Sequence, residues 1–445
     1  MVGNPPPRRD KRGTRRFDRV HTGPVLQILL LLLPALWIAS RYGHTWYVYD
    51  EWSVIDYTSA HHGLSDAFFD FNGHLWVLSF LVYKTQTALF GLAGHAFVWS
   101  IFCASLLAWA VSVRWLLREL QVPGWMATAA AGGVVFGGFA GQNLMFEVQF
   151  APNTAFALGF CAAAVVLRWR SQRATVLAAV LLTAAIGCDS AVALLLIAYV
   201  LVLVVGVVGV QPRIIGPLLV PAALGGLYFL FASKGQTYPA SLKDSLRFGG
   251  RLVVDSAGAP AGGLARTGAV VLLLYVAAFM VAWRRKALSR LSLANLVAAT
   301  GATLILVVSL MITRAAVGAG DPTANNRYLG QVGVLIVLGA LPICCSVATR
   351  GTGGRVSMSF EATICAVLVL AFILNVRTFD TFRTGFEGWN QTVKKQVTGL
   401  PCPVAPDARP LPVLSPQISG ALLNQLQKSG TLKRTGPGCS VAAGG

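Results

Sequence analysis

The feature that most constrains the fold of this chain is its series of long apolar runs that contain almost no charge. Segments 25–40 and 191–210 are clear examples, and they approach or reach the ~20 residues that a helix needs to cross a bilayer. Of all residues, 55% are hydrophobic and only 12% are charged, whereas a typical soluble domain has about 25% charged residues. One soluble core cannot bury so many such runs. The sequence therefore excludes a disordered chain, argues against a soluble multi-domain enzyme and predicts an all-α polytopic membrane protein.

About eleven segments are predicted to be transmembrane helices. They lie at 25–40, 96–114, 123–140, 151–168, 174–188, 190–210, 214–232, 267–283, 292–313, 329–348 and 358–376. A further apolar stretch, 74–90, is interrupted by polar residues at 84–86, so we expect it to be a helix on the outer membrane surface. The alternative is a full span at 74–90, which would invert the orientation of every later segment.

The basic residues predict the orientation. Segment 1–23 is rich in Pro and Arg and has no apolar face, which is typical of a disordered cytoplasmic tail. With this tail inside, the short basic clusters between apolar runs fall on the inner side and the outer loops are nearly neutral, as the positive-inside rule requires. A span at 74–90 would spoil this asymmetry. We therefore expect a multi-pass protein of the plasma (inner) membrane, with its N-terminus cytoplasmic and its C-terminus extracytoplasmic.

The net charge of +19 does not predict nucleic-acid binding, because the basic residues sit in these separate clusters and not along one polar face. The chain is thus divided into the basic tail 1–23, a transmembrane domain 24–376 with a first outer loop at 42–95, and a small extracytoplasmic tail 377–445. Cys402 and Cys439 stand alone in this last tail and are expected to form a disulfide in an oxidising compartment. The other six cysteines fall in or beside apolar runs and are expected to pack there.

The first outer loop is the most informative stretch for function. It carries the adjacent acids Asp50 and Glu51 among several Trp and Tyr residues, and Asn72 and His74 follow about twenty residues later. Aromatic residues also form ordinary belts at the membrane interface, and outer loops also carry solvated acids. A carboxylate beside an apolar interface nevertheless suits general-base chemistry. A metal held by the loop histidines and acids is a minor alternative, because their spacing matches no standard ligand set.

The loop resembles the GT-C superfamily, whose members are integral-membrane glycosyltransferases that use polyprenyl-phosphate sugars. Protein O-mannosyltransferases and lipid-A aminoarabinose transferases belong to it. The resemblance rests on the Asp-Glu pair after the first span, the Asn-Gly-His element at 72–74 and the surface helix that follows. It implies a GT-C-like fold with Asp50 as catalytic base or acceptor-binding acid and Glu51 as its neighbour or substitute.

Two later elements are similar to the same family. Asp189 lies in a polar corner between two apolar runs, like the acidic corner before the sixth span of family members. Arg327 and Tyr328 open a late span from the outer side, as does the Arg-Tyr element that faces the lipid phosphate in several members. The resemblance covers most of 24–376 and leaves out the C-terminal tail.

Physical logic selects the remaining candidates. A polyprenyl-phosphate donor needs a cation for its phosphate, and the planar, permanently charged guanidinium of Arg327 suits it. The alternative for Arg327 is an interfacial anchor for lipid headgroups. Tyr328 and Lys84 are further candidates for the donor phosphate, although an aromatic of the interfacial belt and a snorkelling lysine are their ordinary explanations. His74, Asn72, Asp189, Glu147 and Gln149 are candidates for substrate binding, and a plain polar turn is the alternative for the last two.

The sequence thus predicts a membrane glycosyltransferase that moves a sugar from a polyprenyl-phosphate donor to an extracytoplasmic acceptor, which is a cell-envelope glycan, a glycolipid or a protein. Asp50 would deprotonate the acceptor and Arg327 would stabilise the leaving phosphate. No cofactor is expected, with a divalent metal left as the minor alternative. The rival hypotheses are a transporter or flippase of polyprenyl-linked lipids, a non-catalytic lipid-binding protein, and a polymerase or ligase acting on lipid-linked glycans.

Overall fold

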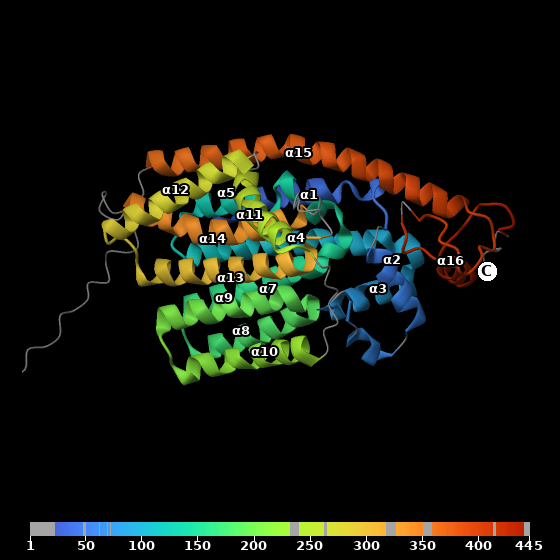
Figure 1. Ribbon diagram of the computed structural model, residues 1–445, viewed down its shortest axis with the longest axis horizontal. Helices are drawn as coiled ribbons and strands as arrows, with labels where there is room; N and C mark the ends of the chain where they lie inside the picture. Colours follow the sequence, from blue (N-terminus) through green and yellow to red (C-terminus); the bar gives the residue numbers. More distant parts are fainter. Residues whose placement is uncertain are drawn as a thin grey trace, which may run out of the picture.

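The computed structural model describes residues 23–47, 50–61, 63–68, 70–71, 73–231, 240–261, 265–316, 326–349, 358–412 and 415–439. Within these ranges the protein is mostly helical (Figure 1). The strands found there are β1 (Asp70–Phe71) and β2 (His74–Leu75), which form one short antiparallel pair. The predicted N-terminal tail lies outside the described residues, apart from Gly23.

Eight helical stretches in the described part of the chain are long and apolar enough to cross a membrane. The protein is therefore an all-α polytopic membrane protein. These stretches are Val77–Glu119, Glu147–Trp169, Ser190–Val208, Pro212–Phe231, Thr267–Arg284, Arg290–Arg314, Arg327–Ala348 and Met358–Gly399. Two shorter apolar helices, Val25–Ala39 and Gln172–Cys188, accompany them.

Each of the eleven predicted segments overlaps a helix, but segments 25–40, 123–140 and 174–188 fall on helices of 16, 12 and 17 residues, which are not among the eight candidate spans. The α-helices are α1 (Pro24–Ala39), α2 (Asp50–Ala60), α3 (Val77–Phe90), α4 (His95–Glu119), α5 (Gly124–Val135), α6 (Gly141–Met145), α7 (Phe150–Trp169), α8 (Gln172–Cys188), α9 (Ser190–Val208), α10 (Pro212–Phe231), α11 (Leu242–Gly258), α12 (Ala265–Arg284), α13 (Arg290–Arg314), α14 (Arg327–Thr349), α15 (Met358–Gly399) and α16 (Gly420–Lys428). The short 3₁₀ turns are η1 (Tyr42–His44), η2 (Leu64–Phe68), η3 (Gly91–Gly94), η4 (Gly138–Ala140), η5 (Glu147–Gln149) and η6 (Ala259–Ala261).

Helix α7 forms the centre of the bundle and packs against α4, α8 and α9. Its buried face is rich in alanine, and Gly159 lies against the side chain of Leu196, so close that an added Cβ would overlap it. Small residues let membrane helices approach closely. The resulting van der Waals packing stabilises the contact, because the hydrophobic effect does not drive helices together within lipid. On the periphery, α10 and α12 leave many large apolar side chains exposed, as expected of surfaces that face lipid.

One end of the bundle collects the short elements of the first loop. Figure 1 shows α2 and α3 beyond the ends of α8, α9 and α10, at the same end as the C-terminal segment. Helix α3 covers residues 77–90 of the predicted surface helix 74–90, whose first two residues form β2 instead. It contacts α2 and lies at the end of the bundle instead of running alongside the central helices.

The last long helix differs most from its predicted extent. We expected a span at 358–376 followed by a tail, but α15 continues without interruption for 42 residues. At 1.5 Å per residue it is about 60 Å long, twice the ~30 Å of a hydrocarbon core. Its far half carries the C-terminal segment, described at 400–412 and 415–439, past the end of the bundle (Figure 1).

Candidate functional site

Asp50 and Glu51 begin α2 and turn in different directions. Asp50 is half-buried, whereas Glu51 is only 1% exposed. Consecutive residues on an α-helix point about 100° apart, so the two carboxylates take different directions. A carboxylate is favourable at both positions, because the N-terminus of a helix carries a partial positive charge.

The buried Glu51 side chain is hydrogen-bonded to neighbouring elements of the protein. One of its carboxylate oxygens accepts hydrogen bonds from the Tyr83 hydroxyl and from the Val148 amide, each at 3.1 Å. Burial, together with the charges of Glu147 and Glu51, raises the pKa of the nearby Tyr47. Glu51 therefore joins α2 to α3 and η5 and has the environment of a structural residue, while Asp50 keeps partial access to the surface.

Asp189 is held by the chain on both sides. Its Oδ1 atom caps α9 by accepting from the Ala191 and Val192 amides, each at 3.1 Å, and lies 3.1 Å from His74 Nδ1. Burial by itself raises the pKa of Asp189, but the charge and hydrogen bond of His74 and the two amides outweigh this effect, so the pKa lies below its usual range. His74 reaches this position because the Leu75 amide donates to the Ser190 hydroxyl, which fixes β2 against the start of α9.

Arg327 is the first residue of α14, and α6 holds it in place. The Asn143 side chain donates to the Arg327 carbonyl at 2.8 Å, and the Gln142 amide donates to the Asn326 side chain at 2.9 Å. The guanidinium donates to the Tyr328 hydroxyl at 3.1 Å and lies 5.0 Å from the centre of that ring. Its Nε atom is buried and has no hydrogen-bond partner among the described residues.

Electrostatic interactions connect Arg327 with Asp50 and with Asp189. Three residues from distant parts of the sequence thus interact through their charges near the start of α14, and no ion pair within 4.0 Å joins them in the described part of the chain. One permanent cation feels the charges of two carboxylates, and its buried Nε atom has no hydrogen-bond partner among the described residues. The guanidinium of this group can receive an anion, and Asp50 is the half-buried carboxylate whose charge interacts with it.

The other predicted residues take more varied positions. Tyr328 is buried and accepts from Arg327, so it belongs to the same cluster. Lys84 donates instead to the Thr58 and His61 carbonyls at 2.8 and 2.7 Å, at the end of α2. Asn72 lies outside the described residues, and no metal-ligand group of three His, Cys, Asp or Glu side chains is present in the part of the chain that the structure describes.

Glu147 and Gln149 are buried in η5, where a plain polar turn was the alternative prediction. The Glu147 carboxylate lies against the ring of His95, which was not among the predicted site residues. Asn143, Tyr83 and Tyr228 were also missed. The Tyr228 hydroxyl donates to Asp70 at 2.6 Å, next to the β1–β2 pair. No local pattern marks these residues, because each becomes polar support for the site only through contacts between distant helices.

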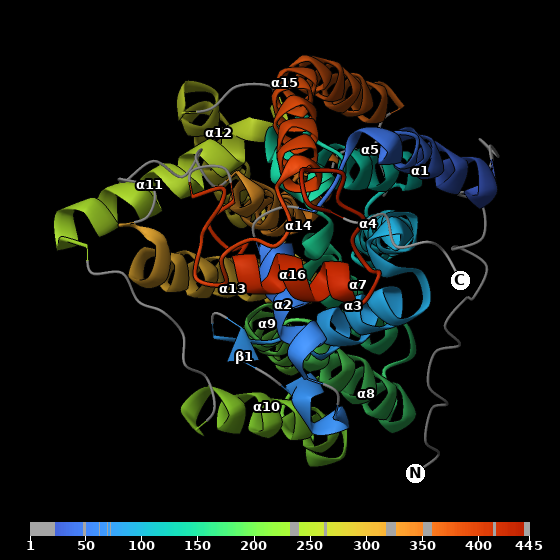
Figure 2. The ribbon, with the colours of Figure 1, turned by 90° about the vertical axis from the view of Figure 1, so that its right-hand side faces the viewer.

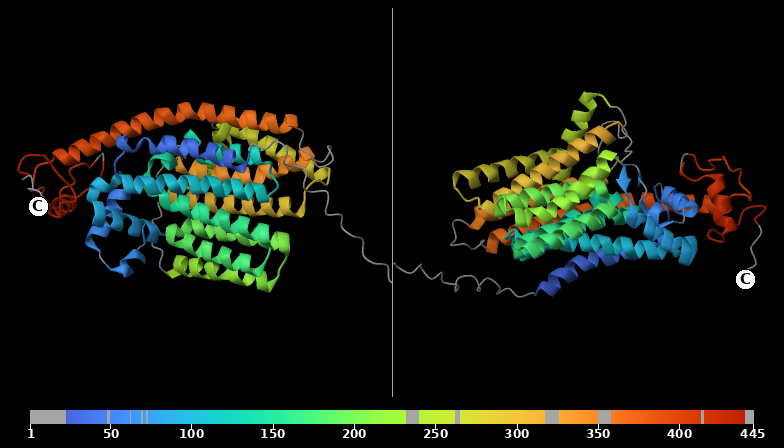
Figure 3. Two further views of the ribbon diagram at one scale, coloured as in Figure 1. Left: turned by 180° about the vertical axis from the view of Figure 1, so that it is seen from behind. Right: turned by 90° about the horizontal axis from the view of Figure 1, so that it is seen from below.

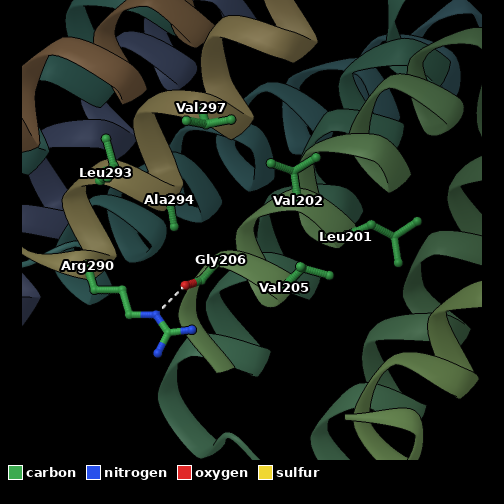
Figure 4. Close-up of a pocket in the computed structure, with 8 residues that line it drawn as sticks. All are labelled: Leu201, Val202, Val205, Gly206, Arg290, Leu293, Ala294 and Val297. Carbon is green, nitrogen blue, oxygen red and sulfur yellow. Dashed lines mark hydrogen bonds between the residues drawn. The ribbon is translucent and has the colours of Figure 1, made fainter. Parts of the chain in front are cut away.

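A separate apolar groove lies between α9 and α13 (Figure 4). Leu201, Val205 and Ala294 line it, and Arg290 donates to the Gly206 carbonyl at its edge at 2.7 Å. The groove is near the far end of α9, about 20 Å along the helix from Asp189 at 1.5 Å per residue. It contains none of the predicted site residues.

The disulfide between Cys402 and Cys439 is present, within the C-terminal segment. Compared with known proteins, the chain matches no protein-family model, no curated protein and no solved structure.

Proposed function

We propose that this protein is a membrane glycosyltransferase of GT-C type that uses a polyprenyl-phosphate sugar. The observation that supports this most is the electrostatic grouping of Arg327 with Asp50 and Asp189, at the end of the bundle where the first loop and the C-terminal segment meet. A lipid-linked donor presents a phosphate at the membrane boundary. A guanidinium at the start of a transmembrane helix lies at the depth where such a phosphate would be.

In this proposal Arg327 binds the donor phosphate and stabilises it as it leaves. A charge-assisted hydrogen bond from a guanidinium to a phosphate oxygen is about twice as strong as a neutral one. The unsatisfied Nε atom and the cation's position beside Tyr328 support this role. His74 and Asp189 then form the rigid side of the site and contact the substrate.

Asp50 acts as the base. The acceptor hydroxyl oxygen attacks the anomeric carbon, its proton passes to Asp50, and the bond between that carbon and the phosphate oxygen breaks. The electron pair of this bond stays with the phosphate, and the configuration of the sugar inverts. The half-buried position of Asp50, in contrast to buried Glu51, supports the choice between the two acids.

The proposed orientation has the N-terminus in the cytoplasm and the site outside, in a plasma (inner) membrane. The shared position of the first loop and the C-terminal segment supports a common side for the two. The Gln425 side chain donates to the Ser59 carbonyl, and the Leu92 amide donates to the Thr431 carbonyl, each at 3.1 Å. An extracytoplasmic side agrees with the disulfide, since such bonds persist in oxidising compartments.

The test is transfer of labelled sugar from a panel of polyprenyl-phosphate donors by the full chain in proteoliposomes. Asp50→Asn should lower the rate about 10²–10⁴-fold, the usual contribution of a general base. Arg327→Gln should lower the rate of transfer by weakening donor binding. Arg327→Lys should keep only part of the unaltered rate, because a lysine cannot bind a phosphate in a bidentate way. Asp407→Asn, an exposed acid of the C-terminal segment, is the matched control. The proposal fails if Asp50→Asn and Arg327→Gln both fold and transfer as the unaltered protein does.

A flippase of polyprenyl-linked lipids is the second candidate, favoured by the buried His95–Glu147 pair. Ionisable pairs inside membrane proteins commonly mark transport pathways. Movement of labelled lipid across the vesicle membrane without sugar transfer, abolished by Glu147→Gln but not by Asp50→Asn, would favour this function.

A further inference from the structure

Helix α11 (Leu242–Gly258) differs in character from the long apolar helices around it. It is amphipathic, and it is not among the stretches apolar enough to cross the membrane. It follows Phe231, which ends one candidate span, and precedes Thr267, which begins the next. Because its two chain connections lead to the ends of spans, α11 belongs at the membrane boundary.

The inner face of α11 fixes it to the bundle. Phe248 and Leu252 are fully buried in a cluster with Tyr328 and Leu329 at the start of α14. On α12, Gly268 lies so close to the Val254 carbonyl of α11 that any added Cβ would overlap it. The helix is thus anchored beside the end of α14 and cannot swing freely.

The rest of the helix projects sideways. In Figure 2, which looks along the bundle, α11 is seen along its length and reaches the periphery, and the right-hand view of Figure 3 shows it standing out from the bundle. A helix that runs across the bundle axis at the membrane boundary lies roughly in the plane of the membrane.

The two flanks of this projecting part have opposite chemistry. Leu242 and Leu246 are 75% and 58% exposed and lie one turn apart. Lys243 and Arg247 are likewise one turn apart and exposed, and neither has a hydrogen bond or ion pair among the described residues. Arg251 continues the basic flank one turn further and contacts the buried Asp255 at 3.6 Å.

This division of one helix fits the interface of a bilayer. In-plane amphipathic helices bury leucines at the boundary between headgroups and acyl chains and place Lys and Arg at the level of the phosphates. Exposed leucines of this size would be unfavourable in water, and a basic flank is attracted to anionic lipid headgroups.

We propose that α11 is a lipid-binding interfacial helix in which Lys243 and Arg247 bind the phosphate of an anionic phospholipid, while Leu242 and Leu246 enter the same leaflet. The site is separate from the proposed catalytic residues and does not depend on glycosyl transfer. Its ligand is a membrane lipid with a net negative headgroup.

The experiment measures lipid retained by the full chain after extraction, using native mass spectrometry. The protein is equilibrated with mixed micelles containing phosphatidylglycerol or phosphatidylcholine. Phosphatidylglycerol should be retained preferentially, and Lys243→Gln/Arg247→Gln should weaken it about 30-fold, as expected for two basic residues near an anionic surface. Leu242→Ser/Leu246→Ser should weaken retention of both lipids.

The matched control is Lys428→Gln/Lys433→Gln, which removes the same charge from exposed positions in the C-terminal segment. It should leave the preference for phosphatidylglycerol unchanged. An equal loss in both charge variants would mean general attraction by net charge and would overturn the proposal. It would also be overturned if inorganic phosphate at equal concentration displaced the lipid, because the ligand would then be a soluble anion.

Discussion

At the scale of single residues, the two adjacent acids of α2 show how position decides chemistry. Glu51 is only 1% exposed and accepts two hydrogen bonds, from the Tyr83 hydroxyl and the Val148 amide. Asp50, one residue earlier, remains half-buried and interacts with the charge of Arg327. The same carboxylate chemistry is thus structural at one position and available for reaction at the next.

Glu51→Ala should therefore lower the free energy of unfolding by about 2–4 kcal/mol, because it leaves two buried donors without an acceptor. Asp50→Asn should change it by no more than about 0.5 kcal/mol, as at most positions away from the core. Equilibrium unfolding of the full chain in mixed micelles measures both. Equal losses of stability in the two variants would contradict the division of roles between these acids.

The His74–Asp189 pair gives a pH dependence of stability. The native pKa of Asp189 lies below its ordinary value of 3.8, so its contribution to stability is complete above that value and is lost as the pH falls through the native pKa. His74→Gln should cost about 1–2 kcal/mol at pH 6 and should move the acid-induced loss of stability to higher pH. Melting temperatures from pH 3 to 6 test this. His44→Gln, at an exposed position, should follow the unaltered protein throughout.

At the scale of elements, α2 is fixed by contacts at its start, at its end and with the C-terminal segment. Glu51 ties its start to α3 and η5, and Lys84 binds two carbonyls at its end. From the C-terminal segment, Gln425 donates to the Ser59 carbonyl. Burial raises the pKa of Asp56 on the same helix, against the opposing charges of Arg409 and His61. The position of Asp50 therefore depends on contacts with distant segments.

Lys84→Met keeps the aliphatic stem and removes the donor to the Thr58 and His61 carbonyls. Hydrogen bonds from a charged group contribute about 1.5–3 kcal/mol, so the end of α2 should open more often. Hydrogen–deuterium exchange at 57–61 should increase, while exchange in α7 should not change, and Lys428→Met serves as the control. Unchanged exchange at 57–61 together with weaker donor binding would instead support the predicted phosphate role of Lys84.

At the scale of the whole molecule, the C-terminal segment is a small unit that is closed by an internal disulfide and contacts the first loop. The Cys402–Cys439 disulfide closes a separation of 37 residues around α16. The buried Leu422, Leu423 and Leu426 supply its apolar interior. This unit sits at the end of the bundle where the proposed site lies (Figure 2).

Cys402→Ser/Cys439→Ser should destabilise this unit by about 4 kcal/mol, the chain-entropy value for a loop of this length. Limited trypsin digestion should then cleave at Lys428 and Lys433 while leaving the bundle intact. Cys365→Ser, which removes a cysteine outside the disulfide, should show no added cleavage. Loss of the whole bundle in the double variant would contradict a separate unit.

Much of the fold could be predicted because helix formation in a membrane is a local property. Lipid offers the backbone no hydrogen-bond partner, so an apolar run within a membrane satisfies its own backbone by forming a helix. All eleven predicted segments fall on helices for this reason. The end of α15 could not be predicted in this way, because its polar half beyond residue 376 is stabilised outside the lipid by packing, for example of buried Phe386, Val393 and Val397.

The sequence by itself determined the membrane class, the positions of the long apolar helices and the presence of acids in the first loop, since run length and local composition encode them. Only the tertiary structure decided which acid of the pair turns inward, and that the charge of Arg327 interacts with those of Asp50 and Asp189. Adjacent helical residues differ by 100° in direction, and residues hundreds of positions apart meet only through packing. No local sequence pattern contains either relation. Single residues of the candidate site could therefore be predicted from the sequence, but their grouping follows only from the three-dimensional structure.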